Sequence, residues 1–137
     1  MSWLTPNASI HYFGIGFEFV KLLPVKYVLF NCFNPILSGK LYSPSHIIPT
    51  LKAPFDLVFI DADKQNYSLY YDLVFDKVRS GGFIFADNVL WSGKIIEEKK
   101  DKDTQKLADF NTKIQQDNRI ENVIVSIRDG ILMARKK

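Results

Sequence analysis

Cysteine is almost absent from this chain, whose 137 residues include only Cys32. One cysteine cannot form an internal disulfide, and no second cysteine or histidine pair lies near it to complete a zinc site. The sequence therefore excludes a small fold held together by disulfides or zinc. Such cysteine usage is typical of a reducing compartment, and a cytoplasmic location is expected.

Long hydrophobic runs and an excess of one charge are also lacking. The most apolar early stretch, residues 13–37, is interrupted by Glu18, Lys21, Pro24 and Lys26, so we expect neither a signal peptide nor a membrane span. The 18 basic and 15 acidic side chains leave a net charge of +3, too little to indicate nucleic-acid binding.

The charged residues are unevenly distributed along the chain. Residues 1–46 contain four of the 33 charged side chains but nine of the 19 aromatic ones, and the first aspartate is Asp56. A length of 137 residues with 47% hydrophobic content is enough for one compact core. We therefore treat residues 1–46 as an atypical segment and residues 47–137 as the recognisable domain.

Within residues 47–137, strand and helix patterns alternate. The run from Phe55 to Asp61 is short, apolar and rich in β-formers, as in a strand buried on both faces of a parallel sheet, and Gly82 to Asp87 has the same character. Residues 119–127 and 131–134 predict a hairpin around Asp129-Gly130.

Two helices are predicted between these strands. The first follows a plausible N-cap at Asp63 and ends before Gly81-Gly82, and the second is capped by Asp103 or Thr104. Their apolar stripes are Leu69, Tyr70, Leu73, Val74 and Val78 in the first, and Leu107, Phe110 and Ile114 in the second. The order strand, helix, strand, helix, hairpin predicts an α/β fold, the closing half of a doubly wound sheet.

Polar side chains follow both predicted parallel strands. Asp61 ends the first, and Asp87 and Asn88 end the second, where ligands of open parallel sheets bind. Neighbouring strands lie about 4.8 Å apart, so these oxygens could converge on one Mg²⁺, Mn²⁺ or Ca²⁺. Alternatively, the two aspartates cap the helices that follow, and spacing alone leaves both interpretations open.

Lys64 comes three residues after Asp61 at the same predicted edge. Most lysines are solvated surface residues. Beside a divalent cation, however, the pKa of this ammonium would fall from about 10.4 toward the range of a general base.

The stretch FDLVFIDADKQNYSLYYDLVFDKVRSGGFIFADNVLWSGKI, followed by DFNTKIQQDNRIENVIVSIRDGILMARKK, resembles the cation-dependent O-methyltransferases of the caffeoyl-CoA and catechol type. The resemblance runs from about Ile47 to Lys137 and includes several motifs in the right order. It implies a class I methyltransferase, Rossmann-like fold and methyl transfer from S-adenosylmethionine to a catechol-like or caffeoyl-CoA-like hydroxyl of a phenolic substrate. A homodimer is a further expectation.

The resemblance also assigns roles to residues. Asp61, Asp87 and Asn88 would hold the metal, and Lys64 would be the base that helps remove the phenolic proton. The remaining assignments are Asp63 and Tyr70 to the methyl donor and, from their place in the loop, Trp91 and Ser92 to the acceptor site. Trp91 is equally explained as a packing residue.

Residues 1–46 depart from the family pattern. The family's donor-binding glycine-rich turn has no convincing counterpart, since Gly14-Ile15-Gly16 lacks a strand-turn-helix context, and this absence also argues against a Rossmann dehydrogenase. We expect the 55–61 strand to have an unpaired edge and exposed apolar faces. The segment could be a replacement that packs on the sheet, native sequence of a truncated gene, or an out-of-frame translation, which its composition favours.

Two functions follow from that departure. The chain is either a metal-dependent O-methyltransferase or a catalytically incompetent fragment that keeps the metal site and lacks the donor-binding half.

Overall fold

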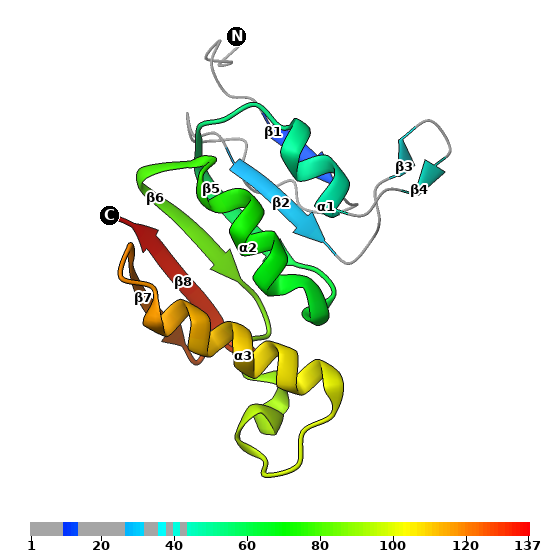
Figure 1. Ribbon diagram of the computed structural model, residues 1–137, viewed down its shortest axis with the longest axis vertical. Helices are drawn as coiled ribbons and strands as arrows, with labels where there is room; N and C mark the ends of the chain where they lie inside the picture. Colours follow the sequence, from blue (N-terminus) through cyan, green and yellow to red (C-terminus); the bar gives the residue numbers. More distant parts are fainter. Residues whose placement is uncertain (1–9, 14–26, 32–35, 38–39, 42–43) are drawn as a thin grey trace, which may run out of the picture.

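The computed structural model describes residues 10–13, 27–31, 36–37, 40–41 and 44–137. Its main sheet has the strand order β1-β2-β5-β6-β8-β7. The strands are β1 (Ile10–Phe13), β2 (Tyr27–Asn31), β5 (Phe55–Asp61), β6 (Val78–Ala86), β7 (Ile120–Val125) and β8 (Ile131–Lys136). The first four strands run parallel, and β8 is antiparallel to both β6 and β7 (Figure 1). The predicted closing half of a doubly wound sheet is thereby confirmed.

The helices α1 (Pro44–Ile47), α2 (Tyr67–Phe75) and α3 (Lys102–Gln116) lie in front of the sheet in Figure 1. Shorter elements are the 3₁₀ helices η1 (Ile48–Thr50), η2 (Lys64–Asn66) and η3 (Trp91–Ile96), and the small hairpin of β3 (Ile36–Leu37) and β4 (Lys40–Leu41). In the described part of the chain, no helix combines the length and apolar character that crossing a membrane requires.

Burial alternates along the central strands as the pleat requires. On β5, Val58 and Ile60 are fully buried, whereas Leu57 and Phe59 on the other face are only half-buried. The same alternation occurs on β6, where Ile84 is buried and its neighbours are less so. The core therefore lies between one face of the sheet and the helices. The prediction that these strands are buried on both faces is wrong, because the residues on the other face are partly exposed, in line with the expected exposure of apolar side chains on the 55–61 strand.

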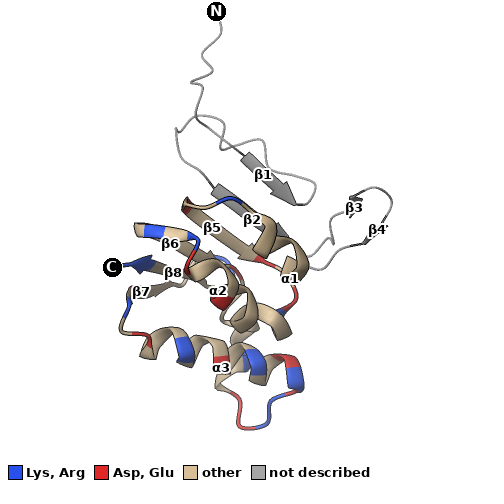
Figure 2. Ribbon diagram, turned by 45° about the horizontal axis from the view of Figure 1, so that its top comes forward, with Lys and Arg blue, Asp and Glu red and all other residues tan. Residues whose placement is uncertain are grey.

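The α3 helix has the predicted apolar stripe. Leu107, Phe110 and Ile114 are all fully buried, whereas the charged residues of the helix, coloured blue and red in Figure 2, are exposed or half-buried. The predicted cap is wrong by two or three residues, because Asp101 is the N-cap and its Oδ1 accepts a hydrogen bond from Thr104 N at 2.7 Å.

The first predicted helix is too long. It ends at Phe75, and Val78 already belongs to β6, where it pairs with Phe55. An apolar residue fits either element, so periodicity alone could not place Val78. The register shifts between Phe55 and Leu57, which accommodates the extra β6 residues around Gly81, whose φ is +75°.

The predicted open edge of β5 is also wrong. β2 pairs with β5 in parallel from Tyr27 opposite Leu57 to Asn31 opposite Asp61, and β1 pairs with the outer side of β2. β5 is therefore hydrogen-bonded on both sides, which protects it from edge-to-edge association.

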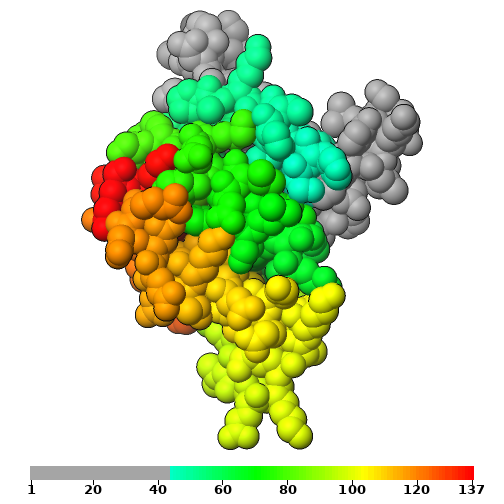
Figure 3. Space-filling view, in the orientation of Figure 1, coloured from blue at the N-terminus to red at the C-terminus, as the bar shows by residue number. Residues whose placement is uncertain are grey.

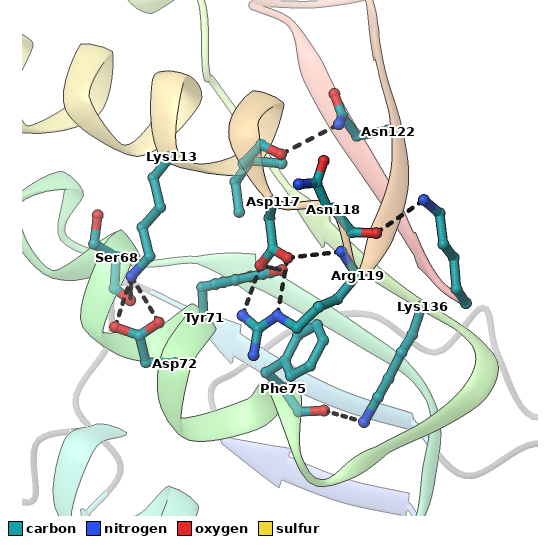
Figure 4. A network of polar contacts seen from close by, with 12 residues as sticks. Ser68, Tyr71, Asp72, Phe75, Lys113, Asp117, Asn118, Arg119, Asn122 and Lys136 are labelled. Atoms are coloured by element: carbon teal, nitrogen blue, oxygen red, sulfur yellow. Dashed lines mark hydrogen bonds and ion pairs between the residues drawn. The ribbon is translucent and has the colours of Figure 1, made fainter.

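A polar network ties the carboxyl end of α3 to α2 and the terminal strand (Figure 4). Asp117 accepts hydrogen bonds from Tyr71 Oη at 2.9 Å and from Arg119 Nη2 at 2.6 Å. The Arg119 guanidinium lies 3.8 Å from the centre of the Phe75 ring, and Lys136 Nζ donates to the Phe75 carbonyl at 2.9 Å. The Arg119 hydrogen bonds lower the pKa of Asp117, and burial raises the pKa of Tyr71.

Candidate metal and acceptor site

The two predicted strand ends lie side by side. Ile60 pairs with Ala86 in the parallel ladder, and Asp87 N donates to Ile60 O at 3.0 Å. Asp61 and Asp87 therefore each come directly after one residue of this pair, at the ends of adjacent strands. The alternative that they cap helices is wrong, because the N-cap positions that follow are Asp63, Asn66, Leu90 and Asp101.

Asp87 is a buried carboxylate, with 3% of the residue exposed. Its Oδ1 accepts a hydrogen bond from Asn88 N at 2.8 Å, and its Oδ2 lies 3.9 Å from Arg128 Nη2. Asn88 has φ +57°, a left-handed conformation that asparagine tolerates better than most residues. These contacts fix both the carboxylate and the residue that follows it.

The donor set of this corner is two carboxylates and one amide oxygen. Among the described residues, no three or more His, Cys, Asp or Glu side chains gather into a group that could hold a metal ion. A set of Asp61, Asp87 and Asn88 suits a hard cation that keeps open positions for other oxygen ligands. The chemistry of these residues and the register of the two strands therefore fit the predicted cation.

Lys64 is not the solvated surface lysine that its residue type suggests. Only 8% of it is exposed, and its Nζ donates to the main-chain oxygen of Asp87 at 3.0 Å. The Nζ also donates to the hydroxyl of Tyr67, which in turn donates to the same Asp87 oxygen at 3.1 Å. The ammonium thus lies at the edge that carries the candidate ligands, 5.7 Å from the centre of the Trp91 ring.

Asp63 and Tyr70, the residues assigned to the methyl donor, lie together. Tyr70 Oη donates to Asp63 Oδ1 at 2.5 Å, and the Asn66 amide donates to Oδ2 of the same carboxylate. Asp63 precedes η2 as its N-cap residue but makes no side-chain capping bond. Its exposed carboxylate is therefore held beside the β5 end by α2.

The loop after Asn88 is fastened to the β7–β8 turn. Val89 N donates to Gly130 O and Leu90 N to Asp129 O, both at 3.0 Å, and Ser92 N donates to the Asp129 carboxylate at 2.6 Å. Trp91 packs partly against the core, whereas Ser92 is exposed. Both predicted acceptor residues thus lie on the loop that leads into the segment projecting below α3 in Figure 3.

Backbone strain gathers at this edge. The described non-glycine residues with positive φ are Asn88, Trp91, Ser92 and Arg128, all in the two loops just described. Such conformations persist only where surrounding contacts enforce them, and they are typical of functional sites.

Sequence reasoning missed three residues here. Tyr67 bridges Lys64 to Asp87, Asn111 Nδ2 donates to Val89 O at 2.8 Å, and Arg128 approaches the Asp87 carboxylate. The three-residue step from Lys64 to Tyr67 was a usable signal, since it places both side chains on one side of a helical turn. No sequence spacing marked the other two, because they come from α3 and the β7–β8 turn.

Gly14-Ile15-Gly16 lies outside the described residues. The strand β1 ends at Phe13, directly before it, so one part of the expected strand-turn-helix context is present.

Comparison with known proteins identifies the family of this chain. The O-methyltransferase family model matches residues 46–137. Tricin synthase 2 of Oryza sativa subsp. japonica is 31% identical over 140 residues, covering 95% of this chain and 46% of that protein. Probable caffeoyl-CoA O-methyltransferase 1 of Dictyostelium discoideum is 38% identical over 84 residues, covering 60% of this chain and 36% of that protein. The chain spans about half the length, or less, of these relatives, and the rice match reaches into residues 1–46.

Solved structures share the fold. The O-methyltransferase from Bacillus cereus in complex with SAH has a TM-score of 0.60 and 31% identity, covering 68% of this chain and 46% of that one. The SAH-bound Podospora anserina methyltransferase PaMTH1 has a TM-score of 0.67 and 22% identity, covering 82% and 61%. From the family match and the rice relative together, this chain belongs to the O-methyltransferase family.

Proposed function

We propose that this chain supplies the metal and acceptor side of an S-adenosylmethionine-dependent O-methyltransferase that acts on a catechol-like or caffeoyl-CoA-like hydroxyl and requires Mg²⁺ or a similar cation. The observation that carries the proposal is that Asp61 and Asp87 directly follow Ile60 and Ala86, which pair on adjacent parallel strands, and that Lys64 Nζ donates to the main-chain oxygen of Asp87.

Each residue has a definite task in this proposal. Asp61, Asp87 and Asn88 would hold the cation, whose Lewis acidity lowers the pKa of a phenolic hydroxyl. Lys64, anchored by Asp87 and Tyr67, would position its nitrogen for the phenolic proton. The anchoring matters because proton transfer requires heavy atoms within hydrogen-bond reach.

Asp63 and Tyr70 would contact the methyl donor. Their mutual hydrogen bond orients the carboxylate at the end of β5 before any ligand arrives. The donor would supply an electrophilic methyl group, and the work of this part of the chain is to keep the acceptor aligned with it. The SAH complex of the 31% identical Bacillus cereus protein supports this donor.

The acceptor site would be walled by Trp91 and Ser92. The Trp91 ring lies near Lys64 Nζ, so an aromatic acceptor stacked on this side chain would face the proposed base. The acceptor in this proposal is a small phenolic molecule, and the assembly is a homodimer.

A second candidate is a catalytically incompetent fragment that keeps the metal corner. The observation favouring it is that the chain spans 46% of tricin synthase 2 and 36% of the Dictyostelium relative. A fragment of this kind would bind a divalent cation and would bind the methyl donor poorly or not at all.

Two measurements on the purified chain separate these candidates. One is a Mg²⁺-dependent methyl-transfer assay with a panel of catechols, and the other is a titration with labelled S-adenosylmethionine. Transfer that disappears on chelation supports the enzyme, and metal binding without donor binding supports the fragment. In an active chain, Lys64→Ala should lower turnover by about 10²–10⁴-fold with metal affinity preserved. As a control, Lys113→Ala, which removes an α3 side chain paired with Asp72 of α2, should retain activity.

A further inference from the structure

Arg128 lies beside the candidate metal ligand Asp87 and has no place in the proposed reaction. Its Nη2 lies 3.9 Å from Asp87 Oδ2, the carboxylate oxygen opposite the one that accepts from Asn88 N. The Arg128 side chain is 68% exposed and the Asp87 side chain 4% exposed, so a solvated cation approaches a buried anion from the solvent side.

The position of Arg128 is imposed by the backbone around it. Its φ is +54°, a conformation that favours glycine, and Gly130 N closes the turn by donating to Ile127 O at 3.0 Å. The next two residues bond to the loop that follows Asn88, as described above. Because the turn is fastened to the same loop that carries Asp87, the guanidinium is kept close to this carboxylate at some conformational cost.

We propose that Arg128 is a counter-ion that compensates the Asp87 carboxylate when no cation is bound and thereby lowers the affinity of the site for divalent cations. A buried carboxylate is costly without a compensating positive charge. When a divalent cation binds to the same carboxylate, the attraction between Arg128 and Asp87 weakens, and the bound cation repels the guanidinium. Arg128 therefore opposes metal binding and would make loading of the site depend on the free cation concentration.

This inference rests on the proposed metal site, and it predicts a gain of affinity from a loss of charge. Arg128→Ala keeps a side chain in the strained backbone position and removes the guanidinium. We expect the Kd for Mn²⁺ to fall by about three- to tenfold, the size of effect for one charge about 4 Å away near a protein surface. Arg128→Lys should stay within about twofold of the parent protein, since the charge remains.

Arg79→Ala is the matched control. The Arg79 side chain is 51% exposed and pairs with Asp56 near the amino end of β5, opposite the strand end that carries Asp61. Its removal changes the net charge by the same amount as the removal of Arg128. Free Mn²⁺ is counted by its electron paramagnetic resonance signal during titration of the full chain, without methyl donor or acceptor. Circular dichroism verifies that each variant is folded.

The outcomes are distinct. Tighter binding in Arg128→Ala, with Arg79→Ala and Arg128→Lys unchanged, supports the inference. Equal affinity of the parent protein and Arg128→Ala overturns it and leaves the metal site intact. An equal gain in Arg79→Ala overturns it in favour of a general charge effect. Failure of the parent protein and Arg128→Ala alike to bind Mn²⁺ overturns the metal site and, with it, the role of Arg128.

Discussion

Gly130 is the position at which one added methyl group should perturb the candidate site most strongly. It lies in the β7–β8 turn with φ +80°, and its carbonyl accepts the hydrogen bond from Val89 N. A Cβ at this position would lie 2.4 Å from Leu90 Cγ and 2.9 Å from Leu90 Cδ1. Leu90 is itself bonded to Asp129 O through its main-chain nitrogen, so the clash falls between two fastened loops.

The expected cost of Gly130→Ala has two parts. The left-handed backbone costs an L-residue about 1–2 kcal/mol, and overpacking a fixed contact adds about 1–3 kcal/mol. The sum of about 2–5 kcal/mol corresponds to a fall in Tm of roughly 8–20 °C at about 4 °C per kcal/mol. The free energy of unfolding is obtained from urea denaturation followed by circular dichroism.

Gly93→Ala isolates the backbone part. Gly93 has the same φ of +80°, is exposed, and has nothing within 4 Å of the added Cβ. This control should lose only about 1–2 kcal/mol. If both variants lose the same free energy, then Leu90 moves aside freely, and the reasoning that the two loops are rigidly fastened is refuted.

Three further perturbations test other parts of the fold. The Arg119 hydrogen bonds lower the pKa of Asp117 in the folded chain. The Asp117 carboxylate therefore stabilises the fold above its unfolded pKa of about 3.9, and this contribution is lost as the pH falls through the lower folded pKa. Asp117→Asn should flatten the fall of Tm between about pH 5 and pH 2. Burial raises the pKa of Tyr71 in the folded chain. The contribution of the neutral phenol to stability is therefore present below its unfolded pKa of about 10 and is lost as the pH rises toward the higher folded pKa. Tyr71→Phe should reduce the loss of Tm above pH 10, and an unchanged dependence of Tm on pH in that range would contradict this. Phe110→Ala removes a fully buried ring that meets Tyr67 edge-on at 5.5 Å and should cost about 3–5 kcal/mol in urea denaturation; a loss below about 1 kcal/mol would exclude Phe110 from the core.

The strands and helix stripes with strong local signals could be predicted from the sequence. The run from Phe55 to Asp61 is apolar, ends in an acid and forms β5 with the expected bounds. The stripe of α3 follows in the same way, since all three predicted apolar positions are buried. Local pattern was sufficient there because burial on one face and hydrogen bonding agree.

Features that depend on distant segments could not be predicted. Val78 is apolar in either a helix or a strand, and only its pairing with Phe55 assigns it to β6. The buried ammonium of Lys64 is satisfied in part by the Asp87 carbonyl, 23 residues along the chain, which accepts a hydrogen bond from it. Arg128 reaches Asp87 through a turn some 40 residues later, so no spacing in the sequence marks the contact.

The hydrogen-bond ladder between β5 and β6 positions the two carboxylates independently of the segment that follows them. Main-chain hydrogen bonds between two interior strands of the sheet set the spacing of Asp61 and Asp87, and these bonds do not depend on the identity of nearby side chains. The segment that contains η3 (Trp91–Ile96) is not part of this ladder, and the region of the chain coloured yellow to yellow-green in Figure 3 projects from the body. If Trp91 and Ser92 line the acceptor site as proposed, substitutions in that segment should change substrate choice while the positions of the two carboxylates stay constant, so engineering of a new acceptor preference should begin there.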